Sequence, residues 1–490
     1  METVPAASHA GRDRLSDLPD CLLRSVLSSL GSLQVVQTSL LSRRWRDLWR
    51  SVPCLDVDQQ DFILEESEPE SPGDGASDAE QEVYSKALKE SLVREIKRQR
   101  RFEDFADVVI LLHGVCPLDA YRLRVVDPGL RTDWHRWIRR GLARLPAELL
   151  LDFRRPLSYY EGPLFCFDFA SGGAGALPLA SRLRRLHLSG LTLAEKFAEE
   201  LRSECTVLED LELVNCKCHY RLGHHIASRS LKRLHIRGSY NCMNTLGSLA
   251  VPALVSLNLD KVPLPAIEGE LQFLDVASVT EPNMYAEEYR NHVLKSLRNA
   301  KVLQLRSFTT MGLLEGEHEE FREFHNLRTL ILIECDIGER CQVLWYVLQN
   351  VPNLERLVLQ DCEISGNCSG ESASSCRGTA FRGCKNLKSI QVKYKDHNVP
   401  HVLVAALTQI AKDVVKTHGG KTNYVGWLDW MSRVVSCNSL CQSAVVAEPD
   451  NSLSDEEHES RVRKRRARKK HARDRAIKAG RRAAHDLARC

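Results

Sequence analysis

A six-residue pattern recurs from residue 183 onward and constrains the fold of this chain more than any other feature. It reads Leu-x-x-Leu-x-Leu, with Ile, Val or Ala replacing a leucine in some copies. The copies begin at Leu183, Leu208, Leu231, Leu254, Leu271, Ala300, Leu327, Leu354 and Leu387. Their successive spacings are 25, 23, 23, 17, 29, 27, 27 and 33 residues. Most of these spacings lie in the window of ~20–29 residues that is typical of leucine-rich repeats, in which each repeat supplies one β-strand and a connector.

One strand with its connector cannot bury its own apolar face, so neighbouring units must stack into a continuous core and a curved parallel sheet. The sequence therefore predicts an α/β fold, an irregular leucine-rich-repeat solenoid with helical or irregular connectors over residues 83–410. Weaker copies of the pattern that begin at Leu118 and Glu148 would extend the repeats toward the N-terminus.

Three repeats place a cysteine three residues after the last leucine of the pattern, namely Cys216, Cys335 and Cys362. A small polar side chain at this position can bind backbone groups where the chain leaves the strand, so we expect buried structural thiols. A metal pair at Cys216 and Cys218 is the alternative, but it lacks a second pair at ligand spacing. The 17 cysteines are odd in number and scattered, which argues against a disulfide scaffold. We expect neither a metal nor another cofactor.

The positions that alternate with the leucines would lie on the concave face of the sheet, where we expect a target protein to bind. The predicted target-binding residues are Arg185, His187, Arg233, His235, Arg237, Val302, Ile331, Ile333, Arg356 and Val358. The acidic residues Asp210 and Glu212 would lie within the basic group, and the copy at Leu271 would add Phe273 and Asp275. The apolar members form an exposed binding patch in one interpretation. In the other, a loop or the C-terminal segment covers them.

Residues 13–57 carry more apolar side chains than so short a segment can bury. Leucine and valine recur at helical spacing from Leu18 to Leu30, Pro19 suits a first helical turn, and Gly31 would end that helix. Ser32 and Ser42 are candidate N-caps for two further helices. Three short helices in ~40 residues are too few to be stable alone. The residues by themselves leave two options open, a partner chain or packing as a cap on the domain that follows.

The same segment resembles a known family. The run Asp13-Arg-Leu-Ser-x-Leu-Pro-Asp20, followed by Thr38-Ser-x-Leu-Ser-Arg-Arg-Trp45 and Leu48-Trp49, looks like an F-box in the form found in plant F-box proteins. The resemblance implies docking onto the Skp-type adaptor of a cullin ubiquitin ligase. Carried over position by position, the adaptor-binding residues would be Leu18, Pro19, Leu22, Leu23, Val26, Leu27, Leu40, Leu41, Ser42, Trp45 and Trp49.

The F-box and the repeats together resemble plant F-box/leucine-rich-repeat proteins over roughly residues 13–410. This resemblance implies a substrate adaptor of an SCF-type ubiquitin ligase, in which the F-box binds the Skp-type adaptor and, through it, the cullin. The repeats would capture an unknown target protein. No residue of the chain would then be catalytic, and ubiquitin transfer would follow from proximity of the bound target. A small-molecule co-ligand is possible, because some relatives sense ligands with such repeats.

The remaining segments are predicted from composition. Asp61 to Glu82 holds nine carboxylates and no Lys or Arg, so we expect a disordered acidic linker over 58–82 between an F-box at 13–57 and the repeats. Residues 1–12 would be a disordered N-terminus and 411–460 a C-terminal segment and linker. The sequence shows neither a secretory signal nor an apolar run near ~18 residues. We expect no membrane association and a location in the nucleus, the cytoplasm or both.

The C-terminal residues 461–490 are strongly basic, with 14 Lys or Arg and 2 Asp or Glu, whereas the chain as a whole carries a net charge of +3. Such a cluster indicates either a nuclear import signal or a merely solvated tail. The import residues would be Arg463, Lys464, Arg465, Arg466, Arg468, Lys469 and Lys470. No aromatic residue interleaves the cluster, so any nucleic-acid binding should be salt-sensitive and unspecific.

Two alternative functions of the whole protein stay open. One is an F-box scaffold outside the ligase, and the other is a nucleic-acid-associated nuclear protein.

Overall fold

The computed structural model describes residues 18–63, 77–114, 117–126, 134–154, 166–167, 169, 180–218, 224–238, 246–262, 265–280, 296–309, 324–338, 341–364, 386–394, 403, 406–407 and 435–437. The chain divides into two units, Met1–Arg154 with Leu164–Asn438, and Arg155–Pro163 with Ser439–Cys490. All described residues belong to the first unit, and the fold below is that of this unit.

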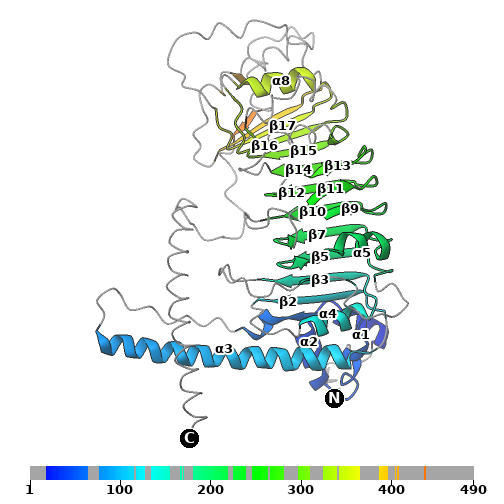
Figure 1. Cartoon of the computed structure of the whole chain (residues 1–490), viewed down its shortest axis with the longest axis vertical. Coiled ribbons are helices and arrows are strands. Elements are labelled where there is room, and N and C mark those ends of the chain that lie inside the picture. Colours follow the sequence, from blue (N-terminus) through cyan, green and yellow to red (C-terminus); the bar gives the residue numbers. More distant parts are fainter. Residues whose placement is uncertain are drawn as a thin grey trace, which may run out of the picture. The chain divides into compact units, whose positions relative to one another are not determined.

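A single parallel sheet organises the unit, and consecutive strands of it stack in chain order (Figure 1). Among the described residues it has thirteen strands, each hydrogen-bonded to the next. They are β1 (Cys54–Asp58), β2 (Ala120–Val125), β3 (Glu148–Phe153), β5 (Arg185–Ser189), β7 (Asp210–Val214), β10 (Arg233–Arg237), β12 (Ser256–Asp260), β14 (Val276–Thr280), β15 (Val302–Arg306), β16 (Thr329–Ile333), β17 (Arg356–Gln360), β18 (Ser389–Lys393) and β19 (Val435–Cys437). One strand per repeat in a parallel sheet confirms the predicted α/β repeat fold.

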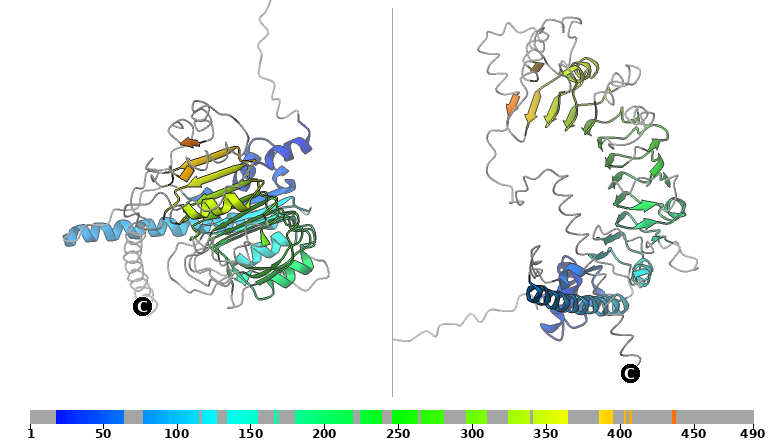
Figure 2. Two further views of the ribbon diagram at one scale, coloured as in Figure 1. Left: turned by 90° about the horizontal axis from the view of Figure 1, so that it is seen from above. Right: turned by 60° about the vertical axis from the view of Figure 1, so that its left-hand side comes forward.

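The connectors between these strands are partly regular. Short parallel strands in them pair across neighbouring repeats, β4 (Cys166–Phe167) with β6 (Thr192–Leu193) and β8 (Lys217–Cys218), and β9 (His224–Ala227) with β11 (Leu246–Ala250) and β13 (Ala266–Ile267). Among the described connectors after β3, helices occur at α5 (Phe197–Glu204) and α8 (Gln342–Asn350). The right-hand view of Figure 2 shows the green and yellow strands following one another along the sheet.

The core is built from the repeated leucines. In the repeat of β5, for example, Leu183, Leu186 and Leu188 are all buried. Where the chain leaves several strands, one residue takes a left-handed backbone conformation, with φ of 69° at Gly190 and 50° at Asn215. The equivalent residues in other repeats are Lys261, Ser307, Glu334 and Asp361. This repeated turn directs the chain back over the leucine core.

The cysteines that follow this turn are buried as predicted. The Cys216 thiol donates to the carbonyl of Leu188 at 3.3 Å, and Cys335 and Cys362 make the same bond to the preceding repeat at 3.3 and 3.5 Å. Burial raises the pKa of the Cys362 thiol to about 12, so the group stays protonated and can donate. Each thiol therefore links the turn of one repeat to the strand before it.

Two repeats lie in a different frame from the predicted one. The strand β14 follows Leu274, not Leu271, and buries Ala277 and Val279 in the core. Phe273 and Asp275 precede β14, so the prediction that they are strand positions on the concave face is wrong. From Leu254 to Leu274 is 20 residues and from there to Ala300 is 26, so these spacings replace the 17 and 29 of the predicted frame and both lie in the typical window. Ala277 occupies the position of the central leucine in this repeat, so the leucine pattern did not indicate the correct frame.

The other shifted repeat is the one at Glu148. Leu149, Leu151 and Phe153 of β3 are buried, whereas the Glu148 side chain points outward and pairs with an arginine. The frame therefore begins two residues earlier, at Pro146. The predicted copy at Leu118 is in frame, with Leu118, Tyr121 and Leu123 buried.

The N-terminal segment forms α1 (Asp20–Leu27), α2 (Ser32–Gln37) and the short 3-10 helices η1 (Thr38–Leu40) and η2 (Leu48–Ser51). The first two predicted helices are present. The predicted third helix, capped by Ser42, is wrong, because residues 43–47 form turns and only η2 follows.

The long helix α3 (Asp78–Leu112) begins within the acidic stretch, and α4 (Trp134–Leu142) packs against it. A capping box starts α3, since the Ser77 and Glu80 side chains each accept from the other's backbone N–H. The 3-10 helix η3 (Gln59–Phe62) continues from β1. Both ends of the predicted 58–82 linker are thus structured, and residues 64–76 lie outside the described part of the chain.

Candidate functional site

The N-terminal helices enclose a small core of their own. Its buried members are Leu23, Leu27, Val35, Trp45, Leu48 and Val52, with Leu18, Leu30 and Trp49 packed against them. Three predicted adaptor-binding residues, Leu23, Leu27 and Trp45, are therefore enclosed by this core and are not on the surface. Their helical spacing and aromatic character are equally typical of a core, so the sequence could not separate the two roles.

Other members of the predicted set remain on the surface. Leu22 and Val26 on α1 are 50% and 52% exposed, and Leu40 and Leu41 are 86% and 69% exposed. Pro19 and Ser42 are exposed, whereas Leu18 and Trp49 are half-buried. Large aliphatic side chains gain free energy when they leave water, so this group favours contact with a further surface. We name Leu22, Val26, Leu40 and Leu41 the aliphatic patch.

Arg44 holds the start of α1 in place. Its guanidinium donates to the carboxylate of Asp20 at 2.7 Å and to the backbone carbonyl of Leu18. It lies in the Ser-Arg-Arg-Trp run of the motif, yet the sequence alone assigned it no role. It joins the two halves of the N-terminal domain, because Asp20 opens α1 and Arg44 follows η1.

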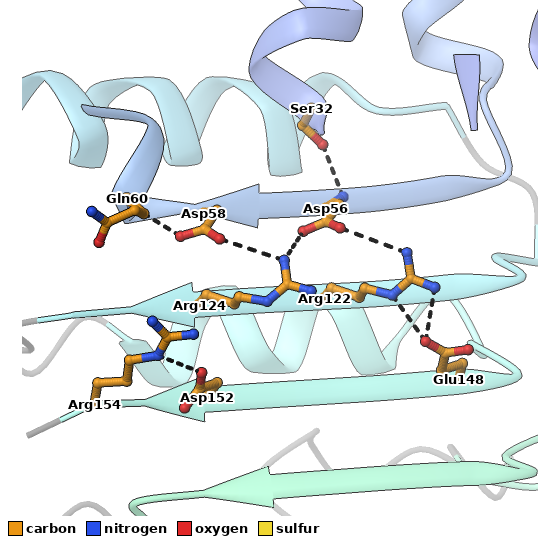
Figure 3. Close-up of polar contacts among 9 residues, drawn as sticks. All are labelled: Ser32, Asp56, Asp58, Gln60, Arg122, Arg124, Glu148, Asp152 and Arg154. Atoms are coloured by element: carbon orange, nitrogen blue, oxygen red, sulfur yellow. Dashed lines mark hydrogen bonds and ion pairs between the residues drawn. The ribbon is translucent and has the colours of Figure 1, made fainter. Parts of the chain in front are cut away.

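The N-terminal domain and the sheet share β1, so no linker separates them. β1 begins two residues after Val52, and α2 packs against it. The backbone N–H of Asp56 donates to the Ser32 hydroxyl at 2.9 Å (Figure 3). Ser32 thus begins a helix as predicted, but its side chain binds β1 and makes no cap. The predicted boundary at residue 57 falls inside this strand.

An ion network crosses the first three strands at this junction (Figure 3). Asp56 on β1 pairs with Arg124 at 2.6 Å and with Arg122 at 3.6 Å, and Arg122 pairs with Glu148 on β3 at 2.9 Å. Burial raises the pKa of Asp56 even though both arginines act in the opposite direction. The network sets the register of β1 against β2, and thereby the orientation of the N-terminal helices on the sheet.

The end of α3 makes two hydrogen bonds to the N-terminal domain. The Nε2–H of buried His113 donates to the Val52 carbonyl at 3.0 Å, and the Gly114 N–H donates to the Arg50 carbonyl at 2.6 Å. Burial and the nearby Arg144 guanidinium lower the pKa of His113, so the imidazole resists protonation in the folded chain.

The buried imidazole makes stability depend on pH. Because the folded pKa of His113 lies below the unfolded one, the unfolded state binds more protons, and stability falls as the pH drops through about 6.5. We expect the free energy of unfolding to decrease between about pH 7.5 and 5.5, and the His113→Gln variant to lose less over this range. Denaturant unfolding at both pH values measures this. An identical loss in both proteins would contradict the assignment.

The positions that alternate with the buried leucines form what we call the open face of the sheet. Over β1 to β12 the charge on this face changes sign from each strand to the next. The charged residues or histidines are Asp56 and Asp58 on β1, Arg122 and Arg124 on β2, Glu148 and Asp152 on β3, Arg185 and His187 on β5, Asp210 and Glu212 on β7, Arg233, His235 and Arg237 on β10, and Asp260 on β12.

This alternation brings the predicted basic and histidine residues together around acidic partners. Glu212 accepts from His187 at 2.8 Å and from His235 at 3.1 Å. Arg185 and Arg233 both pair with Asp210, and Arg237 pairs with Asp260 at 2.8 Å. The predicted basic cluster is thus neutralised from within the sheet, which the spacing of single repeats could not show.

The predicted apolar patch further along the open face is only partly exposed. Val302 and Ile331 are half-buried, whereas Ile333 and Val358 are buried at 6% and 7% exposure. The interpretation of an exposed patch therefore does not hold for Ile333 and Val358, whose burial agrees with the alternative of a covered patch. Arg356 on β17 is exposed as predicted.

Other predicted features lie outside the described residues, including the import cluster at 463–470. Among the residues that the structure does describe, no group of His, Cys, Asp or Glu side chains is placed to hold a metal ion. In the same part of the chain, no helix combines the length and apolarity needed to cross a bilayer.

Comparison with known proteins agrees with this architecture. Residues 15–56 match the family model of the F-box domain. A rice protein (Oryza sativa subsp. japonica) named MEIOTIC F-BOX protein MOF is 34% identical over 433 residues, covering 80% of this chain and 82% of the relative. A protein of Arabidopsis thaliana named F-box/LRR-repeat protein is 26% identical over 433 residues, covering 74% and 82%, and another named putative F-box protein is 28% identical over 369 residues, covering 71% and 74%.

An F-box joined to a leucine-rich-repeat sheet defines a class of proteins that are typically adaptors rather than enzymes. In this class the F-box generally binds a Skp-type adaptor within an SCF complex. The chain itself belongs to the plant F-box/leucine-rich-repeat proteins.

Proposed function

We propose that this chain is the substrate-recognition subunit of an SCF-type ubiquitin ligase. The aliphatic patch binds the Skp-type adaptor, which connects the chain to the cullin, and the open face of the sheet binds a target protein. The observation that carries the proposal is that the apolar side chains of the F-box fall into two sets. One set forms a buried core, and the other, Leu22, Val26, Leu40 and Leu41, is exposed to solvent.

The shared strand β1 supports this proposal mechanically. The Ser32–Asp56 bond and the Asp56–Arg122–Glu148 pairs join the F-box to the sheet without a flexible segment. A target on the open face is then held at a defined orientation to the ligase, which raises the effective concentration of its lysines near the ubiquitin carrier.

Affinity purification of the full-length chain while ligase activity is blocked tests the proposal. We expect the Skp-type adaptor, the cullin and a trapped target to co-purify, and the target to accumulate in cells. A chain that retains the adaptor without the cullin would instead support a scaffold outside the ligase, the principal alternative.

We also propose nuclear import through the basic cluster Arg463, Lys464, Arg465, Arg466, Arg468, Lys469 and Lys470. Its density of positive charge supports this proposal. Replacing all seven residues with serine in a fluorescent fusion should abolish nuclear accumulation. If nuclear accumulation did not change, the cluster would be a solvated tail and not an import signal.

A further inference from the structure

The open face changes character at β14. From β14 to β18 its described positions include no aspartate or glutamate. They are Val276, Ser278, Thr280, Val302, Gln304, Arg306, Thr329, Ile331, Ile333, Arg356, Val358, Gln360, Ser389, Gln391 and Lys393. The sign alternation of β1 to β12 is therefore replaced by apolar, hydroxyl, amide and cationic side chains.

Two of the cations in this region have no acidic partner in the described part of the chain. Arg356 and Lys393 are exposed, and within the described residues neither makes an ion pair. Arg306 pairs with Glu334 at 3.4 Å. The acid next to Arg356 in the chain, Glu355, is already held by Arg328 and by Lys388. The positive charge of Arg356 and Lys393 is thus available to another molecule.

The charges on β5 to β12 are paired, whereas β15 to β18 carry cations that are unpaired among the described residues, and this difference determines which region gives a partner more binding free energy. On β5 to β12 a partner must desolvate arginines whose charge is already compensated, and it finds no free counter-charge there. On β15 to β18 a carboxylate meets an unpaired cation, while an apolar side chain can cover the half-buried Val302 and Ile331.

We propose that β14 to β18 form the target-binding region, and that the target presents an acidic segment with interspersed apolar side chains. This proposal rests on the proposed adaptor function and names the chemistry of its target. Neighbouring strands lie about 4.8 Å apart, so the region from β14 to β18 spans roughly 19 Å, or about six residues of an extended peptide. Gln304, Gln360 and Gln391 offer amides that can bind the backbone of such a segment.

A peptide array tests this chemistry on the full-length protein in complex with its adaptor. Acidic, basic or neutral residues alternate with leucine and isoleucine in the arrayed peptides, and bound protein is measured at low and high salt. We expect the acidic class to bind about tenfold more tightly than the basic class, with the difference reduced by salt.

A matched pair of double variants locates the site. R356Q/K393Q removes two cations from β17 and β18, and we expect it to lose most of the acidic preference. R185Q/R237Q removes two cations of similar exposure from β5 and β10, and we expect less than about a twofold change. Equal losses in both variants, or no preference for acidic peptides, would overturn the proposal.

Two further readouts complete the test. Both double variants should still co-purify with the Skp-type adaptor, so a loss of peptide binding with the adaptor retained concerns the target region alone. Acidic peptides that bind only after Asp455, Glu456, Glu457 and Glu459 are replaced with serine would also overturn the proposal. The occupant of the region would then be this chain's own acidic stretch.

Discussion

Replacing Leu22 and Leu40 with glutamate is expected to weaken binding of the Skp-type adaptor by roughly 100-fold while the chain stays folded. Both side chains are at least half exposed, so glutamate remains in water in the free protein. In the proposed complex the same carboxylates would be buried without partners, which costs several times the lost apolar contact. Titration of the purified full-length variant with the adaptor, by calorimetry or interferometry, measures the change.

Two comparison variants make this result specific. Val83 on α3 is 70% exposed and lies outside the F-box, so Val83→Glu controls for the general effect of an exposed aliphatic-to-acid substitution. Leu23→Ala should instead destabilise the F-box by about 2–5 kcal/mol, because Leu23 is buried in the small core. If Leu22→Glu/Leu40→Glu bound the adaptor as well as Val83→Glu does, the aliphatic patch would not be the docking surface.

The second large effect is expected at Gly190, in the turn that follows β5. Its φ is +69°, and an added Cβ would lie only 1.9 Å from the carbonyl oxygen of Phe153 in the neighbouring repeat. Backbone cannot move aside as a flexible side chain can, so Gly190→Ala should lower the free energy of unfolding by roughly 2–5 kcal/mol. Denaturant unfolding followed by circular dichroism measures this loss.

Gly269 provides the matched control. Its φ is +81°, but an added Cβ would meet no atom within 4 Å. Gly269→Ala should therefore cost only the strain of the left-handed conformation, about 1 kcal/mol. A loss of the same size in both variants would show that the approach of Gly190 to Phe153 is not as close as the structure indicates.

Sequence periodicity predicted the repeat architecture because it reports local burial. Eight of the nine predicted repeats from Leu183 onward are in frame, and the exception at Leu271 arose where Ala277 takes the central leucine position. The structural cysteines were also predictable, since their offset from the last leucine is constant. The shared strand β1 was not, because its pairing with β2 joins residues separated by the whole of α3.

The sequence by itself determined that this chain has an F-box followed by stacked leucine-rich repeats, because motif residues and leucine spacing are local properties of the chain. The tertiary structure alone decided which F-box side chains form a core and which remain as the aliphatic patch. It also decided that acidic residues of β7 pair with the basic cluster on β5 and β10, whereas Arg356 and Lys393 make no ion pair with another described residue. These outcomes depend on which strands become neighbours in the sheet. The sequence of a single repeat does not specify which side chains of other repeats it will pair with.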